Sequence, residues 1–474
     1  MAAADVVVVG AGPSGLAAAL EATRHGATVT LVECLDGVGG LSRTVAAGGC
    51  RFDIGPHRFF TQNDEVRRLF RDTVGSEAIR VDRMTRILYD GRYFDYPLTI
   101  GNAIGGTGLG EAVALGASYL RARVGALSAG DVEPRDFEAW VVRQFGRRLY
   151  ESFFRVYTEK VWGVPCTRIS AEWAGQRIRG LSFAAAVRHA VLGARRGGPR
   201  SFEQVFDYPR LGAGQVYETM AETAVERGAT LRTGARTKRV LVDGTRVRAI
   251  EVADAAGTML VEGRSFLCSA PLTDLVAMVD PPPPPQVLDA ARALRHRDHI
   301  AVNLVADGLP FRDQWIYVHD RRVHAARVAN YRNFSAAMAG GRDVSPLTVE
   351  YFAFPGDDFD RLTDSALIGL AGQELDRLGL VRAGQLSEGF VVRSPGAYPL
   401  LELGHERHIA VIRDWLAGFA NLLPIGRAGM FKYNNQDHAM MTGLLGARTL
   451  LGIGRFDPWA VNIDAGYHER GTAR

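Results

Sequence analysis

The stretch VVVVGAGPSGLAAALEATRHGATVTLVE, residues 6–33, decides the fold of this chain of 474 residues. Its run of valines is typical of a buried parallel strand. Gly10, Gly12 and Gly15 follow with the spacing G-x-G-x-x-G, and then come an Ala- and Leu-rich helix and a second strand that ends at Glu33. This order of strand, glycine turn, helix and acidic residue predicts a dinucleotide-binding α/β unit.

Each glycine of this turn has a mechanical reason. Gly10 permits the tight turn, Gly12 lets a pyrophosphate approach the backbone, and Gly15 lets the helix pack on the strand. The helix N-terminus then attracts the anion, because its N–H groups and its dipole both favour negative charge. The carboxylate of Glu33 is placed to bind ribose hydroxyls.

A second glycine cluster follows at Gly37, Gly39 and Gly40, with Arg43 directly after it. It allows another close approach of the backbone to the pyrophosphate and to the ring of a flavin. This continuation resembles FAD-binding proteins of the amine oxidase and protoporphyrinogen oxidase type more than NAD dehydrogenases. The resemblance implies that the cofactor is FAD.

Two later segments extend this resemblance. The sequence ARTKRVLVDGTRVRAIEV, residues 235–252, predicts a β-hairpin, and FLCSAPL, residues 266–272, predicts the strand that closes the nucleotide-binding sheet. Both occur in the same order in that flavoprotein superfamily, which implies a second cofactor element at Val240. The predicted fold class is α/β: a Rossmann-type FAD-binding domain with a helical insertion and an antiparallel-sheet substrate domain.

The hydrophobic pattern predicts three domains. Residues between the two halves of the nucleotide-binding sheet are helix-patterned, with Phe137, Val141 and Phe145 near helical spacing. A run of prolines at residues 281–285 is expected to be a stiff linker before a strand-rich segment. The predicted boundaries are a discontinuous FAD-binding domain at 1–84 and 205–280, completed by 420–455, a helical domain at 85–204, and a substrate-binding sheet domain at 286–419.

Composition limits the partners. A hydrophobic content of 47% and a charged content of 23% are typical of a soluble globular protein. The net charge of +4, without a Lys/Arg-rich run, argues against nucleic acid as a partner. The cysteines lie far apart, without metal-ligand spacing, so no metal is expected. No long uncharged apolar window predicts a transmembrane segment, and the strand-like start of the chain favours a cytoplasmic location over export.

Three further segments carry a more specific resemblance. They are GPHRFFTQNDEV at residues 55–66, VYTEKVWG at 156–163 and GRAGMFKYNNQD at 426–437. Their signatures and their order resemble those of UDP-galactopyranose mutases, flavoenzymes that interconvert the pyranose and furanose rings of a nucleotide sugar. The resemblance implies a small-molecule substrate, a nucleotide sugar, and leaves an NAD(P)H or flavin reductant open as a partner. The oligomeric state stays open.

The resemblance also implies roles for single residues. Tyr157 and Trp162 would border the substrate pocket, and His57 would lie near the flavin. Arg177, with one inserted residue after Trp162, would contact flavin and substrate. Arg427 and Tyr433 would hold the substrate diphosphate and face the flavin ring; these two, with Arg177 and His57, are the predicted catalytic residues.

The remaining positions of the last segment are matched less closely. Asn435 stands where the family commonly has Asp, whereas Asp437 is kept. A helix that begins near Asn434 would point its positive end at the flavin pyrimidine. Asn434 and Asp437 are therefore predicted to bind the cofactor and Asn435 the substrate, and Phe202 is the candidate for the aromatic residue that stacks on the base.

Such a mutase uses N5 of the reduced flavin to attack the anomeric carbon and expel the nucleotide diphosphate. This chemistry needs cations for the leaving group, which Arg177 and Arg427 would supply as planar donors. It needs no side-chain nucleophile and no metal. The first functional hypothesis is therefore a mutase-like ring isomerisation through reduced flavin N5.

Plainer interpretations stand beside these. Tyr157 and Trp162 can be core aromatics, His57 can be structural, and the polar residues from Asn434 onward can simply cap a helix. The role of Lys160 is left open. The second functional hypothesis is a true FAD-dependent oxidoreductase, a dehydrogenase or oxidase of the protoporphyrinogen oxidase or amine oxidase type.

Overall fold

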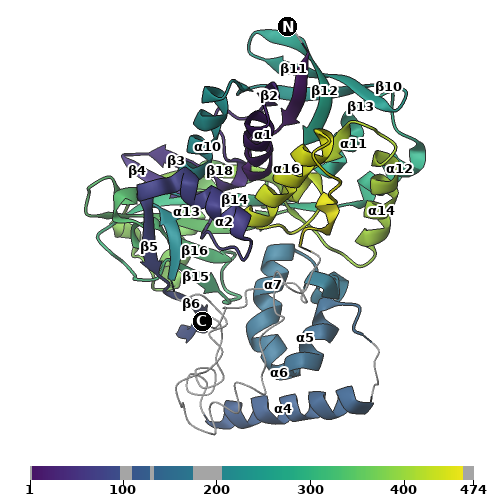
Figure 1. The fold of residues 1–474 in the computed structure, drawn as a ribbon. Helices are drawn as coiled ribbons and strands as arrows, with labels where there is room; N and C mark the ends of the chain where they lie inside the picture. Colours follow the sequence, from purple (N-terminus) through teal and green to yellow (C-terminus); the bar gives the residue numbers. More distant parts are fainter. Residues whose placement is uncertain (1–2, 97–108, 129–132, 174–204, 463–474) are drawn as a thin grey trace.

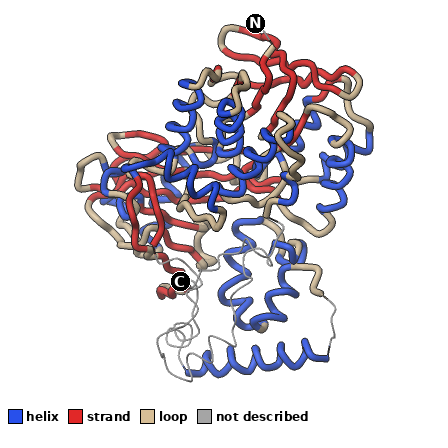
Figure 2. The backbone as a smooth tube through the Cα atoms, in the orientation of Figure 1, coloured by secondary structure: helices blue, strands red, loops and turns tan. Residues whose placement is uncertain are grey.

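The computed structural model describes residues 3–96, 109–128, 133–173 and 205–462. Two large sheets lie in its upper part, and a group of helices lies below them (Figure 1). Figure 2 shows the same division by secondary structure. None of the helices in these ranges is both long enough and apolar enough to cross a bilayer.

The first sheet is built on the strand with the valine run. Strand β1 pairs in parallel with both β2 and β12, and β12 also pairs in parallel with β19. The strand order is β13-β10-β11-β12-β1-β2-β9. The bounds are β1 (Ala4–Val9), β2 (Val29–Val32), β9 (Thr230–Arg232), β10 (Arg236–Asp243), β11 (Arg246–Asp254), β12 (Gly257–Cys268), β13 (Val279–Asp280) and β19 (Leu422–Pro424).

This sheet agrees with the local predictions. Strands β10 and β11 form the expected antiparallel hairpin, and β12 closes the parallel part of the sheet beside β1. The helices packed around it are α1 (Pro13–Arg24), α10 (Gly214–Glu226), α11 (Leu272–Met278), α12 (Pro285–Ala293), α14 (His405–Leu416) and α16 (Gln436–Leu450). The fold class is therefore the predicted one, a Rossmann-type α/β domain with further parts inserted into it.

The second sheet has the strand order β18-β14-β17-β16-β15-β6-β7. Its long strands β14, β17 and β18 pair antiparallel, as expected for the substrate domain. Helix α13 (Asp364–Arg377) packs against its core. The bounds are β6 (Thr85–Tyr89), β7 (Arg92–Asp95), β14 (His296–Asp307), β15 (Trp315–Val318), β16 (Arg327–Asn330), β17 (Val344–Ala353) and β18 (Leu386–Pro399).

Two of the predicted boundaries differ from the structure. The segment from residue 85 does not start a helical domain: β6 pairs in parallel with β15, and β7 pairs with β6, in the second sheet. Arg86 fixes this pairing through bonds of 2.9 and 2.6 Å to Asp313. At the other boundary, Pro285 is already the first residue of α12, and both α12 and α14 bury apolar side chains on the first sheet. The proline run therefore leads directly into a helix rather than into the substrate sheet.

The helical part lies between β7 and β8 in the chain. It contains α4 (Leu109–Ser128), α5 (Phe137–Phe145), α6 (Arg147–Leu149) and α7 (Arg155–Trp162). Asp136 caps α5 by accepting a bond of 2.8 Å from the N–H group of Ala139. Helix α7 ends at Gly163, which has the left-handed conformation typical of a helix C-terminus.

Two short antiparallel strand pairs are linked through the buried residue Asp53, which also bonds to Tyr331 beside the second sheet. They are β3 (Thr44–Ala47) with β4 (Cys50–Asp53), and β5 (Ala78–Asp82) with β8 (Val205–Pro209); α2 (Asp64–Val74) lies between them in the chain. Asp53 accepts bonds of 2.6 Å from the hydroxyl groups of both Thr44 and Tyr208. Its carbonyl oxygen accepts a bond of 2.6 Å from the hydroxyl of Tyr331, next to the second sheet.

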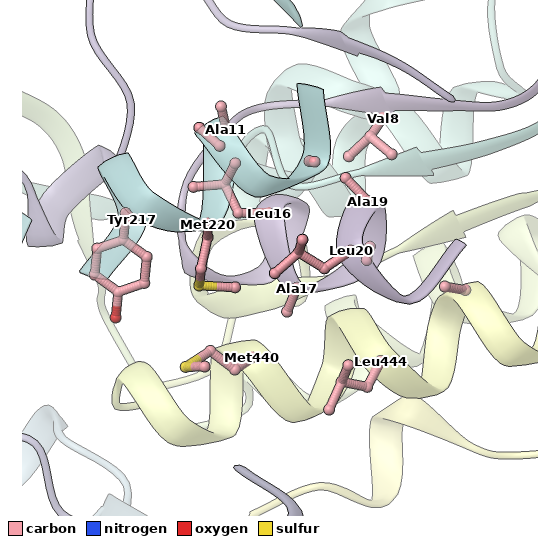
Figure 3. Close-up of a cluster of buried hydrophobic side chains, with 14 of the residues drawn as sticks. Val8, Ala11, Leu16, Ala17, Ala19, Leu20, Tyr217, Met220, Met440 and Leu444 are labelled. Carbon is pink, nitrogen blue, oxygen red and sulfur yellow. The ribbon is translucent and has the colours of Figure 1, made fainter. Parts of the chain in front are cut away.

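The last helix, α16, packs on α1 at very short range. Figure 3 shows Met440 and Leu444 of α16 beside Ala17 and Leu20 of α1 in a shared apolar core. A Cβ atom on Gly443 would lie 2.0 Å from the carbonyl oxygen of Ser14 in α1. The two helices can therefore approach this closely only because residue 443 has no side chain.

We expect Gly443→Ala to lower the free energy of unfolding by about 1–3 kcal/mol or more, because two backbones must separate. Gly369→Ala is the matched control: residue 369 is exposed in α13, and nothing lies within 4 Å of an added Cβ atom. That variant should be stabilised by roughly 0.5–1 kcal/mol. Chemical unfolding measures both, and equal stability of the two variants would contradict the packing described here.

Candidate active site

The glycine turn after β1 leaves one side of its backbone open. A Cβ atom on Gly10 would lie 2.2 Å from the Ser269 hydroxyl oxygen, and one on Gly15 would lie 1.8 Å from the Gly10 carbonyl oxygen. At Gly12, by contrast, the nearest atom to an added Cβ is the Cα atom of Gly40, at 3.9 Å. Gly10 and Gly15 are thus required by the fold itself, whereas Gly12 and Gly40 face each other across accessible backbone.

The N-terminus of α1 lies at this opening. Its N-cap residue, Gly12, offers no side chain to the first N–H groups of the helix. On the far side, Arg43 donates from Nη1 to the carbonyl oxygen of Gly40 at 2.7 Å. Uncapped helix N–H groups, a positive helix end and a neighbouring guanidinium together suit the pyrophosphate of a dinucleotide.

Glu33 lies where the sequence predicted it, at the end of β2 beside the glycine turn. Its carboxylate is 95% buried, at a relative exposure of 5%, and accepts bonds from the N–H groups of Ala11 at 2.7 Å and Leu35 at 2.9 Å. Val240 lies in β10 within the apolar core of the first sheet. Contacts of Glu33 with the ribose and of Val240 with the cofactor stay predictions.

The segment after β19 lies against the same turn. A Cβ atom on Gly426 would lie 2.4 Å from the hydroxyl oxygen of Ser14, and one on Gly429 would lie 2.8 Å from the carbonyl oxygen of Cys268. The short helix α15 (Gly426–Gly429) therefore rests on the start of α1 and on the end of β12. This contact carries Arg427 to the dinucleotide turn.

Arg427 is held between aromatic rings with one donor atom left over. Its guanidinium carbon lies 4.0 Å from the ring centre of Tyr433 and 4.6 Å from that of Tyr398. Nε donates to the carbonyl oxygen of Ala397 at 3.0 Å, and Nη1 donates to that of Asn434 at 3.2 Å. Nη2 is buried and has no hydrogen-bond partner among the described residues. Because buried donors are normally satisfied, this atom marks a place for a ligand.

Helix α7 brings its aromatic residues to the aromatic cluster that Tyr398 and Tyr433 form around Arg427. Trp162 lies 5.7 Å from Tyr433 and 6.0 Å from Tyr398 between ring centres. It is only 1% exposed, so it packs behind the two tyrosines. Tyr157 stacks on His319 at 5.1 Å. The arrangement agrees with both interpretations of these residues, and their contact with a substrate stays a prediction.

Sequence reasoning missed a second cation beside this cluster. Arg327 of β16 donates from Nη2 to the buried carboxylate of Glu350 at 2.5 Å and to the Tyr398 hydroxyl oxygen at 2.9 Å. His299 Nε2 lies 2.8 Å from the same Glu350 oxygen. Burial would raise the pKa of Glu350, but the charge of Arg327 and the contact with His299 lower it to about 2. The signal in the sequence was one acidic residue in the otherwise apolar strand TVEYFAF.

His57 completes the cluster. Burial lowers its pKa to about 4, against the opposing influence of Glu350, and the charges of Arg327 and Arg427 lower it further. Its imidazole is therefore neutral at neutral pH, and its buried Nδ1 atom has no partner within the described part of the chain. The net charge at the cluster is positive, since two arginines face one carboxylate.

The start of α16 combines a helix cap with buried polar side chains. Asn435 is the N-cap residue, and its N–H group donates to Nδ1 of His438 at 3.2 Å. Asn434 is buried; its Oδ1 accepts from Asn462 at 3.2 Å, whereas Nδ2 has no partner in the described structure. Asp437 is buried in the first turn of the helix. The predicted residues Arg177 and Phe202 lie outside the described residues.

Lys160, whose role the sequence left open, has a structural role in the described residues. Its ammonium group donates to three carbonyl oxygens, those of Val318 at 3.2 Å, Asp320 at 2.6 Å and Ala325 at 2.9 Å. These carbonyls belong to the end of β15 and to the turn that follows it. Lys160 therefore fastens α7 to the second sheet and keeps its aromatic residues in place.

Comparison with known proteins places these features in context. The model of the family "Flavin containing amine oxidoreductase" matches residues 13–385. A probable UDP-galactopyranose mutase of Klebsiella pneumoniae is 29% identical over 173 residues, which is 35% of this chain and 43% of that protein. Putrescine oxidase of Kocuria rosea is 30% identical over 252 residues, 51% of this chain and 50% of that protein. The alignments thus span half or less of these relatives.

Solved structures show the same fold. A reduced UDP-galactopyranose mutase superposes with a TM-score of 0.84 at 22% identity, over 97% of this chain and 99% of that chain. A putative protoporphyrinogen oxidase from Exiguobacterium sp. 255-15 gives a TM-score of 0.69 at 17% identity, over 94% and 98% of the two chains. At these identities the likeness concerns the fold alone.

The open side of the glycine turn leads to a prediction about the cofactor. Gly12→Val should leave the apoprotein folded, because the nearest atom to an added Cβ is 3.9 Å away, but it should abolish FAD binding by filling the pyrophosphate position. Gly15→Ala should instead impair folding, because its Cβ atom would lie 1.8 Å from a carbonyl oxygen. Circular dichroism and flavin absorbance separate the two cases; yellow Gly12→Val protein would refute the assignment.

His319 gives a prediction about pH. Burial, with a further contribution from Lys160, lowers its pKa to about 3, whereas the unfolded chain titrates near about 6.5. The unfolded state therefore binds more protons between these values, and the free energy of unfolding falls as the pH falls through this window. From about pH 7.5 to about pH 5 the native protein should lose roughly 2 kcal/mol more than His319→Phe, which keeps the ring stack. Parallel stability curves in urea unfolding would show this to be wrong.

Proposed function

We propose that this chain isomerises the ring of a nucleotide-activated sugar. It belongs to the family of flavin containing amine oxidoreductases and is thus an FAD-dependent flavoenzyme. The observation that carries the proposal is the environment of Arg427. Its guanidinium lies between two tyrosine rings, beside the dinucleotide turn, with Nη2 buried and without a partner among the described residues.

The charge of the cluster supports an anionic substrate. Arg327 and Arg427 both lie close enough to His57 to lower its pKa, and Glu350 compensates only one of these two charges. A site with an uncompensated buried cation favours a diphosphate and disfavours an ammonium group, since like charges repel in a poorly solvated pocket. A nucleotide sugar carries the fitting charge.

The residues of the cluster have complementary tasks in such a reaction. When bound in reduced form, FAD supplies the nucleophilic N5 atom that an anomeric carbon requires. Arg427 donates from Nη2 to the departing diphosphate, and the rings of Tyr398 and Tyr433 hold the guanidinium plane in position. Glu350 orients Arg327 and compensates its charge, and neutral His57 adds no charge to the site.

A second candidate function is supported by one atom. Oε1 of Glu350 is buried without a partner among the described residues and can accept a hydrogen bond from an amine. One relative of this chain is named as an oxidase of the amine putrescine. The alternative is therefore an FAD-dependent oxidation of an amine or another hydride donor.

Anaerobic turnover distinguishes the two reactions. Dithionite-reduced enzyme is mixed with a panel of nucleotide hexoses, and the ring form of the product is followed by NMR while flavin absorbance is recorded. The proposal predicts isomerised sugar, flavin that stays reduced over many turnovers, and no reaction with oxidised enzyme. Oxidised enzyme that bleaches with a diamine and consumes O₂ stoichiometrically would establish the alternative.

Arg427 variants test the site. Arg427→Ala should lower kcat/KM by roughly 10² or more, because one donor aimed at developing charge typically contributes about 2.7–4 kcal/mol. FAD content should stay nearly unchanged, and Arg427→Lys should restore activity only in part, since a point charge cannot replace a planar stacked group. Arg413→Ala, an exposed arginine of α14, is the control. Turnover of Arg427→Ala equal to that of the control would place the substrate elsewhere.

A further inference from the structure

A cavity of about 460 Å³ lies behind α7, where this helix meets the second sheet. Positive side chains are frequent in its wall: Arg155 and Lys160 of α7, Arg297 of β14, and Arg321 after β15. Two acidic residues, Glu159 and Asp357, also line it. The volume lies within the range of about 300–1,000 Å³ that is usual for small-molecule sites.

This cavity is separate from the aromatic cluster at Arg427. Besides Arg155, the lining residues from α7 and its C-cap are Val156, Glu159, Lys160 and Gly163, with the spacing i, i+3, i+4 and i+7 of a single helix face. Tyr157, Val161 and Trp162 project from the opposite face toward the aromatic cluster. Helix α7 therefore separates this cavity from the aromatic cluster.

Arg297 is the unusual residue of the cavity. It is 5% exposed, and no ion pair of 4.0 Å or less joins it to a carboxylate in the described structure, although Asp357 and Asp298 act on it from farther away. Nη2 donates to the carbonyl oxygen of Phe352 at 2.5 Å, and the guanidinium lies 4.4 Å from the ring of Phe354. Nη1 lies against Gly163, where an added Cβ atom would be 2.1 Å away, and Nε is buried without a hydrogen-bond partner among the described residues.

Both acidic residues of the cavity already accept hydrogen bonds from the protein. Glu159 accepts from Arg155 at 3.2 Å along α7. Asp357 accepts from the N–H groups of Phe354 at 2.9 Å and Asp360 at 2.8 Å in its own turn. Positive charge in the wall is therefore only partly compensated, and a buried cation without a partner is costly.

We propose that this cavity binds the phosphate or carboxylate group of a small anionic ligand, with the guanidinium of Arg297 as the central donor. Arg155 and Arg321 are exposed and form the rim through which the anion enters. Phe352, Phe359 and Tyr351 offer apolar surface to the rest of the ligand. Burial lowers the pKa of Arg297 to about 10 because it destabilises the charged guanidinium. A bound anion offsets this destabilisation.

The proposal is tested on the FAD-loaded full-length protein that carries Arg427→Ala, so that the probes do not bind at the aromatic cluster. Inorganic phosphate and citrate are titrated at constant ionic strength, with chloride as the reference, and binding is followed by calorimetry. Saturable binding of phosphate alone assigns a phosphate ligand, and binding of citrate alone assigns a carboxylate. Absence of saturable binding by both probes overturns the proposal.

Further substitutions identify the cavity. Arg297→Gln should weaken binding by roughly tenfold or more, and Arg321→Ala by a smaller factor, because charge-assisted hydrogen bonds are lost. Glu159→Gln removes a negative charge and releases Arg155, so binding should become tighter, which a damaged fold could not produce. Arg227→Ala, an exposed arginine at the end of α10, is the control for net charge. If Arg321→Ala and Glu159→Gln both bind like Arg227→Ala, the anion binds elsewhere.

Discussion

The contact of α16 and α15 with the first turn of α1 is the constraint on which the site depends. Gly426 and Gly443 both lie so close to Ser14 that neither position has room for a side chain. The C-terminal segment is thereby fixed against the N-terminal dinucleotide turn, although more than 400 residues separate them in the sequence. Backbone packing thereby places Arg427 and Asn434 beside the dinucleotide turn.

The second sheet contributes a buried ion pair to the site. The pairing of β16 with β17 places Arg327 opposite Glu350, and β14 adds His299 on the other side. Within this apolar environment the pair can stay ionised because each member satisfies the other. Arg427 has no such acidic partner among the described residues, so the aromatic cluster around it keeps a positive charge. The same physical argument applies to Arg297 on the other side of α7.

The predictable parts of the structure were the local ones. The strand, glycine turn and helix of residues 4–24 could be predicted because their pattern is continuous in the sequence, and the signature around Arg427 and Tyr433 indicated one wall of the site. Arg327, Glu350 and Tyr398 come from three strands that only the sheet brings together. Likewise, β6 looked like the start of the helical part because its partner, β15, lies more than 200 residues later. Pairings of this kind leave no periodic signal in one sequence.

The central claim is that the pocket beside the flavin is selective for anions, and equilibrium binding tests it most directly. The FAD-loaded protein is titrated with a nucleoside diphosphate and, separately, with an aliphatic diamine, and each titration is followed by the change in the flavin absorption spectrum. The charge of Arg427 and Arg327 predicts that the nucleoside diphosphate perturbs the flavin and that the diamine does not. Binding of the diamine with no response to the diphosphate would contradict the account.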